Sequence, residues 1–149
     1  MGHSAKLIAF LALAPLAGCQ RAEPSLQLTQ PSSNQHSRDV RYTATLALAF
    51  RGSDKIKDQV AWDLLLEMLD EDKTLQDFRS TLPDGREVAN EAAARETTLG
   101  ALRAVQELHR KQPHMDLAQL NPALEKLAAS KNRAVSTQAK QVQQALAPS

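Results

Sequence analysis

The spacing of apolar side chains predicts helices along most of the chain after residue 38. In the first helix, expected over 39–51, the stripe at positions i, i+4, i+7 and i+8 consists of Val40, Ala44, Ala47 and Leu48. Ser37 or Asp39 is available as its N-cap, and Gly52 is a typical stop signal. We expect the stripe to face the core of a helical domain.

Four further helices follow from the same period. They are expected over 57–71, 87–111, 122–129 and 133–146. Their inward positions are Val60, Leu64, Leu65, Met68 and Leu69 in the second helix, Val88, Ala92, Leu99, Leu102, Val105 and Leu108 in the third, Leu124 and Leu127 in the fourth, and Val135, Ala139, Val142 and Leu146 in the last. Trp62 shares the stripe of the second helix, which favours burial over a role in binding. Asn132 is the expected cap of the last helix. Gly100, inside the third, marks either a close helix approach or a tolerated glycine.

Residues 70–85, between the second and third predicted helices, break this period. Their end, Pro83-Asp84-Gly85, is a turn sequence, because proline fixes φ, aspartate accepts local hydrogen bonds and glycine tolerates positive φ. Phe78 and Leu82 are apolar residues in a polar stretch, so they either fold back onto the core or form part of a contact surface. The second interpretation predicts a partner-binding site here. Its candidate residues are Asp70, Asp72, Phe78, Leu82 and Arg86.

The composition favours an all-α fold. Aromatic residues make up 3% of the chain, and alanine and leucine supply most of a hydrophobic fraction of 42%. Such a composition is typical of closely packed helices rather than of a sheet sandwich. The 149 residues carry 18 basic and 17 acidic side chains, so that no overall field attracts nucleic acid. We therefore expect one helical domain without a nucleic-acid partner.

The first nineteen residues have the anatomy of a secretory signal peptide. Lys6 precedes the apolar run LIAFLALAPLAG, which is shorter than the roughly 20 residues of a membrane-spanning helix. The run ends in Leu16-Ala17-Gly18-Cys19, which resembles the lipobox of bacterial lipoproteins. In that family the cysteine sulfur receives a diacylglyceryl group, the signal peptide is cut before the cysteine, and the new amino terminus is acylated. The resemblance implies that Cys19 is the lipid attachment point.

A lipid anchor implies a location in the bacterial cell envelope. Several acyl chains give lasting anchorage, because each buried methylene contributes about 0.8 kcal/mol and a single chain binds reversibly. Gln20 stands in place of the aspartate associated with inner-membrane retention, which favours the outer membrane with the protein facing the periplasm. A cleaved signal peptide without lipid and an uncleaved anchor are the alternatives. Since Cys19 is the only cysteine, no intramolecular disulfide can form.

These observations divide the chain into three parts. Residues 1–18 are the predicted signal peptide, residues 19–38 the lipidated cysteine and a linker, and residues 39–147 the helical domain. The linker is polar and contains two prolines, so that it cannot bury enough surface to offset the entropy of ordering. We expect a flexible tether with a typical span of about 25 Å.

Two predicted helical pairs share a pattern. The sequences LLLEMLDEDKT from Leu64 and PALEKLAASKN from Pro122 match at leucine, glutamate and lysine positions. The helices VRYTATLAL from Val40 and AVSTQAKQVQQAL from Ala134 share a valine followed four residues later by alanine. These patterns resemble HEAT repeats over about 39–147, in roughly two and a half repeats. The resemblance implies an α-α superhelix in which stacked pairs supply the core. An irregular helical bundle is the alternative.

The sequence contains no convincing catalytic or metal site. His109 and His114 straddle Pro113 and lack the i, i+4 spacing of zinc motifs on a helix. Asp70-Glu71-Asp72 lacks the alternating acids and the glycine of a calcium loop. Neither a G-x-S-x-G motif nor a glycine-rich phosphate loop occurs. We therefore expect no enzymatic activity, cofactor or metal.

The leading expectation is a membrane-anchored lipoprotein whose helical repeats bind another protein, because stacked repeats present extended surfaces. Its partners would be membrane lipid, through acylated Cys19, and a protein. The alternative is an accessory or regulatory subunit of a periplasmic enzyme. A weak enzyme or metal binder is a third possibility.

Overall fold

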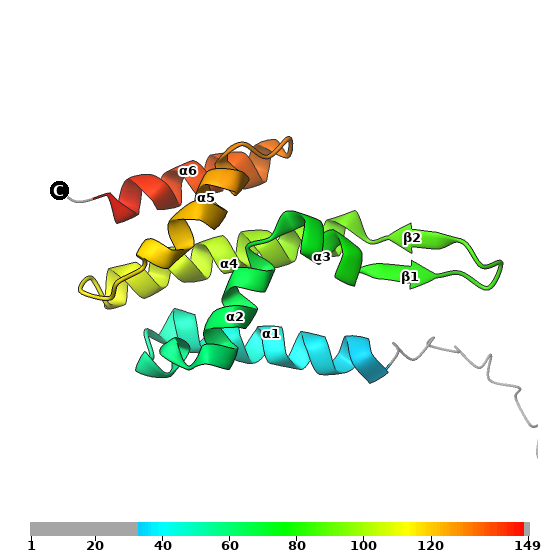
Figure 1. Cartoon of the computed structure of the whole chain (residues 1–149), viewed down its shortest axis with the longest axis horizontal. Helices are drawn as coiled ribbons and strands as arrows, with labels where there is room; N and C mark the ends of the chain where they lie inside the picture. The colour runs from blue at the N-terminus through cyan, green and yellow to red at the C-terminus, as the bar shows by residue number, and fades with distance from the viewer. Residues whose placement is uncertain (1–32, 148–149) are drawn as a thin grey trace, which may run out of the picture. The chain divides into compact units, whose positions relative to one another are not determined.

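The computed structural model describes residues 33–147. The predicted signal peptide, the lipobox with Cys19 and most of the predicted linker lie outside the described residues. Within 33–147 the chain forms α-helices, two short 3-10 helices and one β-hairpin (Figure 1). The all-α class is therefore confirmed for this part of the chain, whereas its HEAT-like character stays a prediction.

The elements follow one another in a simple order. The helices are α1 (Ser33–Arg51), α2 (Gln59–Met68), α3 (Glu71–Asp77), α4 (Glu91–Lys111), α5 (Asn121–Ala128) and α6 (Arg133–Leu146). The 3-10 helices are η1 (Asp54–Lys57) and η2 (Ala118–Leu120), and the strands are β1 (Arg79–Thr81) and β2 (Glu87–Ala89).

Helix α4 lies at the centre of the helical unit. It packs against α1 on one side and α6 on the other, so that these three helices form one layer (Figure 1). Helices α2 and α5 cross one face of this layer. Helix α2 contacts both α1 and α4, and α5 contacts α6. Helix α3 packs on α4 next to the hairpin. As a result, α1 and α6 are the two outer helices of the layer.

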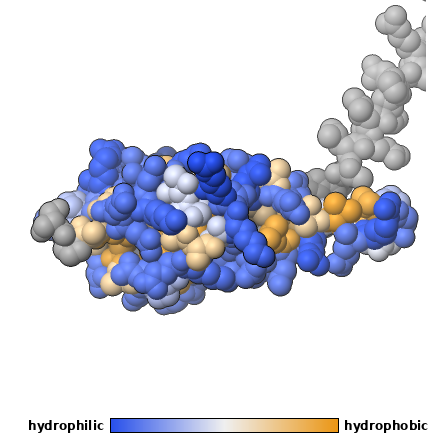
Figure 2. All heavy atoms as spheres, turned by 90° about the horizontal axis from the view of Figure 1, so that it is seen from above, coloured by the Kyte–Doolittle hydropathy of each residue, from blue (hydrophilic) through white to orange (hydrophobic). Residues whose placement is uncertain are grey.

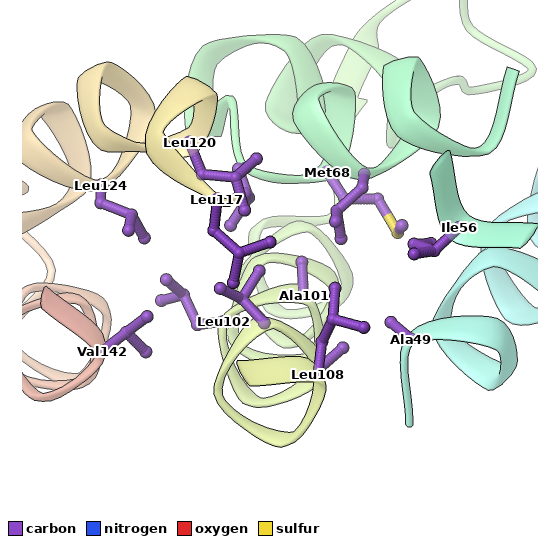
Figure 3. Packing of buried hydrophobic residues seen from close by; sticks show 14 of the residues in the cluster. Ala49, Ile56, Met68, Ala101, Leu102, Leu108, Leu117, Leu120, Leu124 and Val142 are labelled. Atoms are coloured by element: carbon purple, nitrogen blue, oxygen red, sulfur yellow. The ribbon is translucent and has the colours of Figure 1, made fainter. Parts of the chain in front are cut away.

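The core follows α4 because that helix is apolar on both of its covered sides. Its buried residues are Ala94, Thr98, Leu99, Ala101, Leu102, Ala104, Val105 and Leu108. Figure 3 shows α4 side chains between Met68 and Ile56 on one side and Leu124 and Val142 on the other. Trp62 is buried, as its position on the α2 stripe predicts.

The predicted inward stripe of the first helix is only partly confirmed: Leu48 is half-buried against the core and Ala47 is half-buried, but the first two positions of the stripe are exposed. Val40 is 56% exposed and Ala44 is also exposed, whereas Tyr42, Thr45 and Ala49 face the core. The reason is that Tyr42 buries a large ring and its hydroxyl donates a hydrogen bond to Glu67 Oε1 at 2.5 Å. Burial, together with this bond to a carboxylate, raises the pKa of Tyr42 above its ordinary value.

Three other inward positions are also exposed. Val60, at the start of α2, is 69% exposed, and Val88 is 49% exposed because it lies in β2 rather than in a helix. Ala92 lies in the first turn of α4 and is exposed. The remaining predicted inward positions of α2, α4, α5 and α6 are buried, except Leu146, which is half-buried.

The stop signal at Gly52 and the N-cap at Asn132 are confirmed, whereas the predicted start of α1 is not. Gly52 ends α1 with φ of 66°, and the N–H of Ser53 donates to the Leu48 carbonyl at 3.0 Å. Asn132 caps α6, because its side chain accepts from the N–H groups of Ala134 and Val135. Helix α1, however, begins at Ser33, so that the predicted caps Ser37 and Asp39 lie inside it.

Candidate protein-binding site

The 70–85 segment and the residues after it form a short helix followed by a β-hairpin. Strand β1 pairs with β2 in antiparallel register, with Ser80 opposite Val88. The predicted turn Pro83-Asp84-Gly85 connects the strands: Gly85 has φ of 83°, and its N–H donates to the Leu82 carbonyl at 2.9 Å. A three-residue loop that ends in a left-handed glycine is a common hairpin connection.

The two faces of the hairpin differ in polarity. Because side chains alternate along a strand, Ser80 and Leu82 share a face with Val88, which lies opposite Ser80. Leu82 is 36% exposed and Val88 is 49% exposed. On the other face, Arg79 and Glu87 form an ion pair at 3.4 Å. Figure 2 shows apolar atoms on the hairpin, at the right of the view.

Phe78 lies at the base of the hairpin. Its carbonyl accepts a hydrogen bond from Asn90, at the start of α4, at 2.8 Å. Its ring is half-buried against the core, and the guanidinium carbon of Arg38 lies 4.2 Å from the ring centroid. Arg38 also donates a hydrogen bond to the carbonyl of Asp77. Phe78 thus folds back onto α1, and it holds the hairpin against the helices.

Asp70 and Asp72 are used within the fold. Asp70 is the N-cap of α3, where its carboxylate accepts from the N–H groups of Asp72 at 3.1 Å and Lys73 at 3.3 Å. Lys126, on α5, lies 3.1 Å from Asp70 Oδ1 and 2.9 Å from Asp72 Oδ2. The two carboxylates therefore link α3 to α5.

The charges at this link shift two pKa values. Partial burial raises the pKa of Asp70, but the hydrogen bonds from Lys126 and from the Lys73 N–H outweigh it, so that the pKa lies below its ordinary value. The hydrogen bonds to Asp72 and Asp70 raise the pKa of Lys126. Both groups therefore stay charged at neutral pH.

Arg86 lies at the far end of the hairpin, opposite Leu82. Its carbonyl accepts from the Leu82 N–H at 2.8 Å, and its side-chain Nε donates to Asp84 Oδ2 at 2.7 Å. The backbone N–H of Arg86, followed by its side chain, holds the pKa of Asp84 below its ordinary value. These local bonds stiffen the turn and leave the guanidinium of Arg86 exposed.

The structure thus divides the predicted site residues into two groups. Phe78, Leu82 and Arg86 belong to the hairpin, whereas Asp70 and Asp72 lie at the other end of α3. No hydrogen bond or ion pair described within 33–147 connects the two groups. Val88 is an additional exposed residue that the sequence reasoning assigned to a helix. The Pro-Asp-Gly turn was the available sequence signal for a hairpin.

Other functional features were sought in the same part of the chain. Among residues 33–147, no three or more histidine, cysteine, aspartate or glutamate side chains are grouped to hold a metal ion. In this range, no helix combines the length and apolar character needed to cross a membrane. His109 is half-buried near the end of α4, and His114 is exposed in the loop that follows.

Comparisons with protein-family models, with curated proteins and with solved structures gave no match to this chain.

Proposed function

We propose that this chain is a membrane-anchored lipoprotein of the bacterial cell envelope whose helical domain binds another protein. The anchor rests on the lipobox Leu16-Ala17-Gly18-Cys19. The binding role rests on one observation, the exposure of Leu82 and Val88 on the same face of the hairpin. Exposed apolar surface with polar surroundings is typical of protein contact sites.

The composition of the hairpin supports a protein as the partner. Leu82 and Val88 are exposed apolar residues on one face of the hairpin, and Phe78, at its base, is packed against the core. Arg86 adds an exposed guanidinium beside Leu82, and arginine is enriched among the residues that dominate binding energy. The nearly equal numbers of basic and acidic residues, 18 and 17, do not favour nucleic acid.

Site-specific photocrosslinking in the bacterial host tests the binding role. A photoreactive amino acid at Val88 or Leu82 is expected to give discrete crosslinked products with another protein. The matched position is Thr81, which is exposed on the polar face of the same hairpin. Products from Thr81 alone, or from none of the three positions, would contradict the proposed binding face.

The number of crosslinked proteins separates the two functional alternatives. A single enzyme recovered in fixed stoichiometry favours an accessory subunit of that enzyme. Several envelope proteins favour a general binding module.

The anchor is tested separately. A Cys19→Ala precursor is expected to lose labelling by a fatty-acid probe and to leave the membrane fraction, because no other cysteine is present to receive the lipid. The wild-type precursor is the control. Unchanged labelling of the variant would show that the lipid is attached at another residue.

A further inference from the structure

Helix α1 has apolar side chains on two sides. Tyr42, Thr45 and Ala49 face the core, whereas Val40 and Ala44 are exposed. A helix with two apolar sides is typical of an element that is covered on both. On the second side, the described residues half-bury Leu48 but leave Val40 and Ala44 uncovered.

The uncovered side of α1 borders a groove against α2. This groove has a volume of about 270 Å³, and its floor contains the buried residues Thr45, Ala61 and Leu64. Ala44 and Val60 line it as exposed residues. With 69% exposure, Val60 is the most exposed large apolar side chain within 33–147. Burial of these apolar side chains against another surface would contribute a favourable free energy that their exposure to water does not provide.

The opposite outer helix, α6, has a polar outer side. Its exposed residues are Arg133, Ala134, Thr137, Lys140, Gln141, Gln144 and Ala145. In stacked helical proteins a terminal helix with a polar outer face ends the stack, whereas an apolar face requires a further element. The α6 side of one copy is therefore a poor cover for the α1/α2 groove of another. The α1/α2 side of a second copy offers a matching apolar surface.

The charges that line the groove also suit a second copy. Arg41 and Lys55 are basic and Asp58 is acidic, and all three are exposed. Within residues 33–147, neither Arg41 nor Asp58 takes part in an ion pair. A two-fold axis places the same surface on both partners, so that Arg41 of each copy can pair with Asp58 of the other.

We propose that two copies of this chain form a symmetric dimer through the α1/α2 groove. Such an interface is closed, because each copy uses its uncovered side and presents a polar α6 side outward. The inference is independent of the proposed partner binding, since the hairpin does not line this groove.

Sedimentation equilibrium of the detergent-solubilised full chain tests the dimer. The wild-type chain is expected to show a protein mass twice that of the monomer. Val60→Asp is expected to raise the dimer dissociation constant by at least about 10-fold, because it places a carboxylate in an apolar contact. Val88→Asp is the matched control, since Val88 is also exposed but lies on the hairpin. Far-UV circular dichroism verifies that both variants keep their helices.

A charge exchange tests the symmetric arrangement. Arg41→Glu alone is expected to weaken the dimer, and Arg41→Glu combined with Asp58→Arg is expected to restore it. A monomeric wild-type chain, or a dimer unaffected by Val60→Asp, would overturn the proposal. If the chain is monomeric and its Val60→Cys variant resists thiol labelling, the chain's own N-terminal residues would be the cover of the groove instead of a second copy. Failure of the double variant to restore association would overturn the two-fold arrangement.

Discussion

Helices α1 and α6 flank α4 on opposite sides, but they distribute their apolar side chains differently. In α6, Val135, Ala139 and Val142 are fully buried, and its outer side is polar apart from two alanines. In α1, Val40 and Ala44 are exposed although Tyr42 and Ala49 are buried. The outer side of α6 is therefore suited to water, whereas α1 keeps apolar side chains exposed, and the proposed dimer rests on this difference.

A valine-to-aspartate substitution is expected to change the free energy of unfolding very differently in α6 and in α2, and this is the largest expected contrast. Val142→Asp places an unpaired carboxylate in the core and is expected to lower the free energy of unfolding by more than about 3 kcal/mol. Val60→Asp places the carboxylate in solvent and is expected to change it by less than about 0.5 kcal/mol in dilute protein. Urea unfolding followed by circular dichroism measures both. Equal losses would mean that the α1/α2 side is as well covered as the α6 side.

Two glycines probe the contact between α1 and α4. Gly52→Ala is expected to destabilise the protein by about 2 kcal/mol, because φ is 66° and the new Cβ would lie 2.8 Å from Lys111 Cβ. Gly100→Ala is expected to stabilise it by up to about 1 kcal/mol, since its Cβ would meet only Leu46 Cδ1, at 3.7 Å. Thermal unfolding of the two variants beside the wild type measures both effects. Destabilisation by Gly100→Ala would indicate a closer helix approach than the structure shows.

Substitutions at the ion pairs that link α3 to α5 are expected to change the free energy of unfolding least. Asp70→Ala removes the N-cap of α3 and should cost about 1 kcal/mol. Lys126→Met removes only the ion pairs and should have a smaller effect, because solvent screens them. Urea unfolding of both variants at neutral pH compares the cap with the ion pairs.

The contribution of Asp70 is expected to depend on pH. Its pKa is lower in the folded protein than its ordinary value, so that the stabilisation is fully present above about pH 4 and is lost as the pH falls through the folded pKa. The difference in stability between wild type and Asp70→Ala should therefore shrink in acid. A difference that grows on acidification would contradict this assignment.

Several features of the fold could be predicted from short stretches of sequence. The bounds of α6, its cap at Asn132 and the left-handed ends at Gly52 and Gly85 depend on residues within one turn of each other. The start of α1 could not be predicted in this way. Residues 33–38 carry no apolar periodicity, and Arg38 is held by Asp77 and Phe78, which lie far along the chain.

The candidate site could be predicted only in part. The turn at Pro83-Asp84-Gly85 and the unusual apolar residues Phe78 and Leu82 were visible in the sequence. The exposure of Val88 was not, because a valine fits a helix stripe as well as a three-residue strand. The ion pair between Asp70 and Lys126 joins residues 56 positions apart and therefore depends on the tertiary structure.

The sequence by itself determined that this part of the chain is helical and where most helices end, because these properties arise from propensity, period and capping between near neighbours. Only the tertiary structure decided which side of α1 faces the core. That helix offers two apolar stripes, and the choice between them depends on how Tyr42 packs with Glu67 and α4, which are remote in sequence.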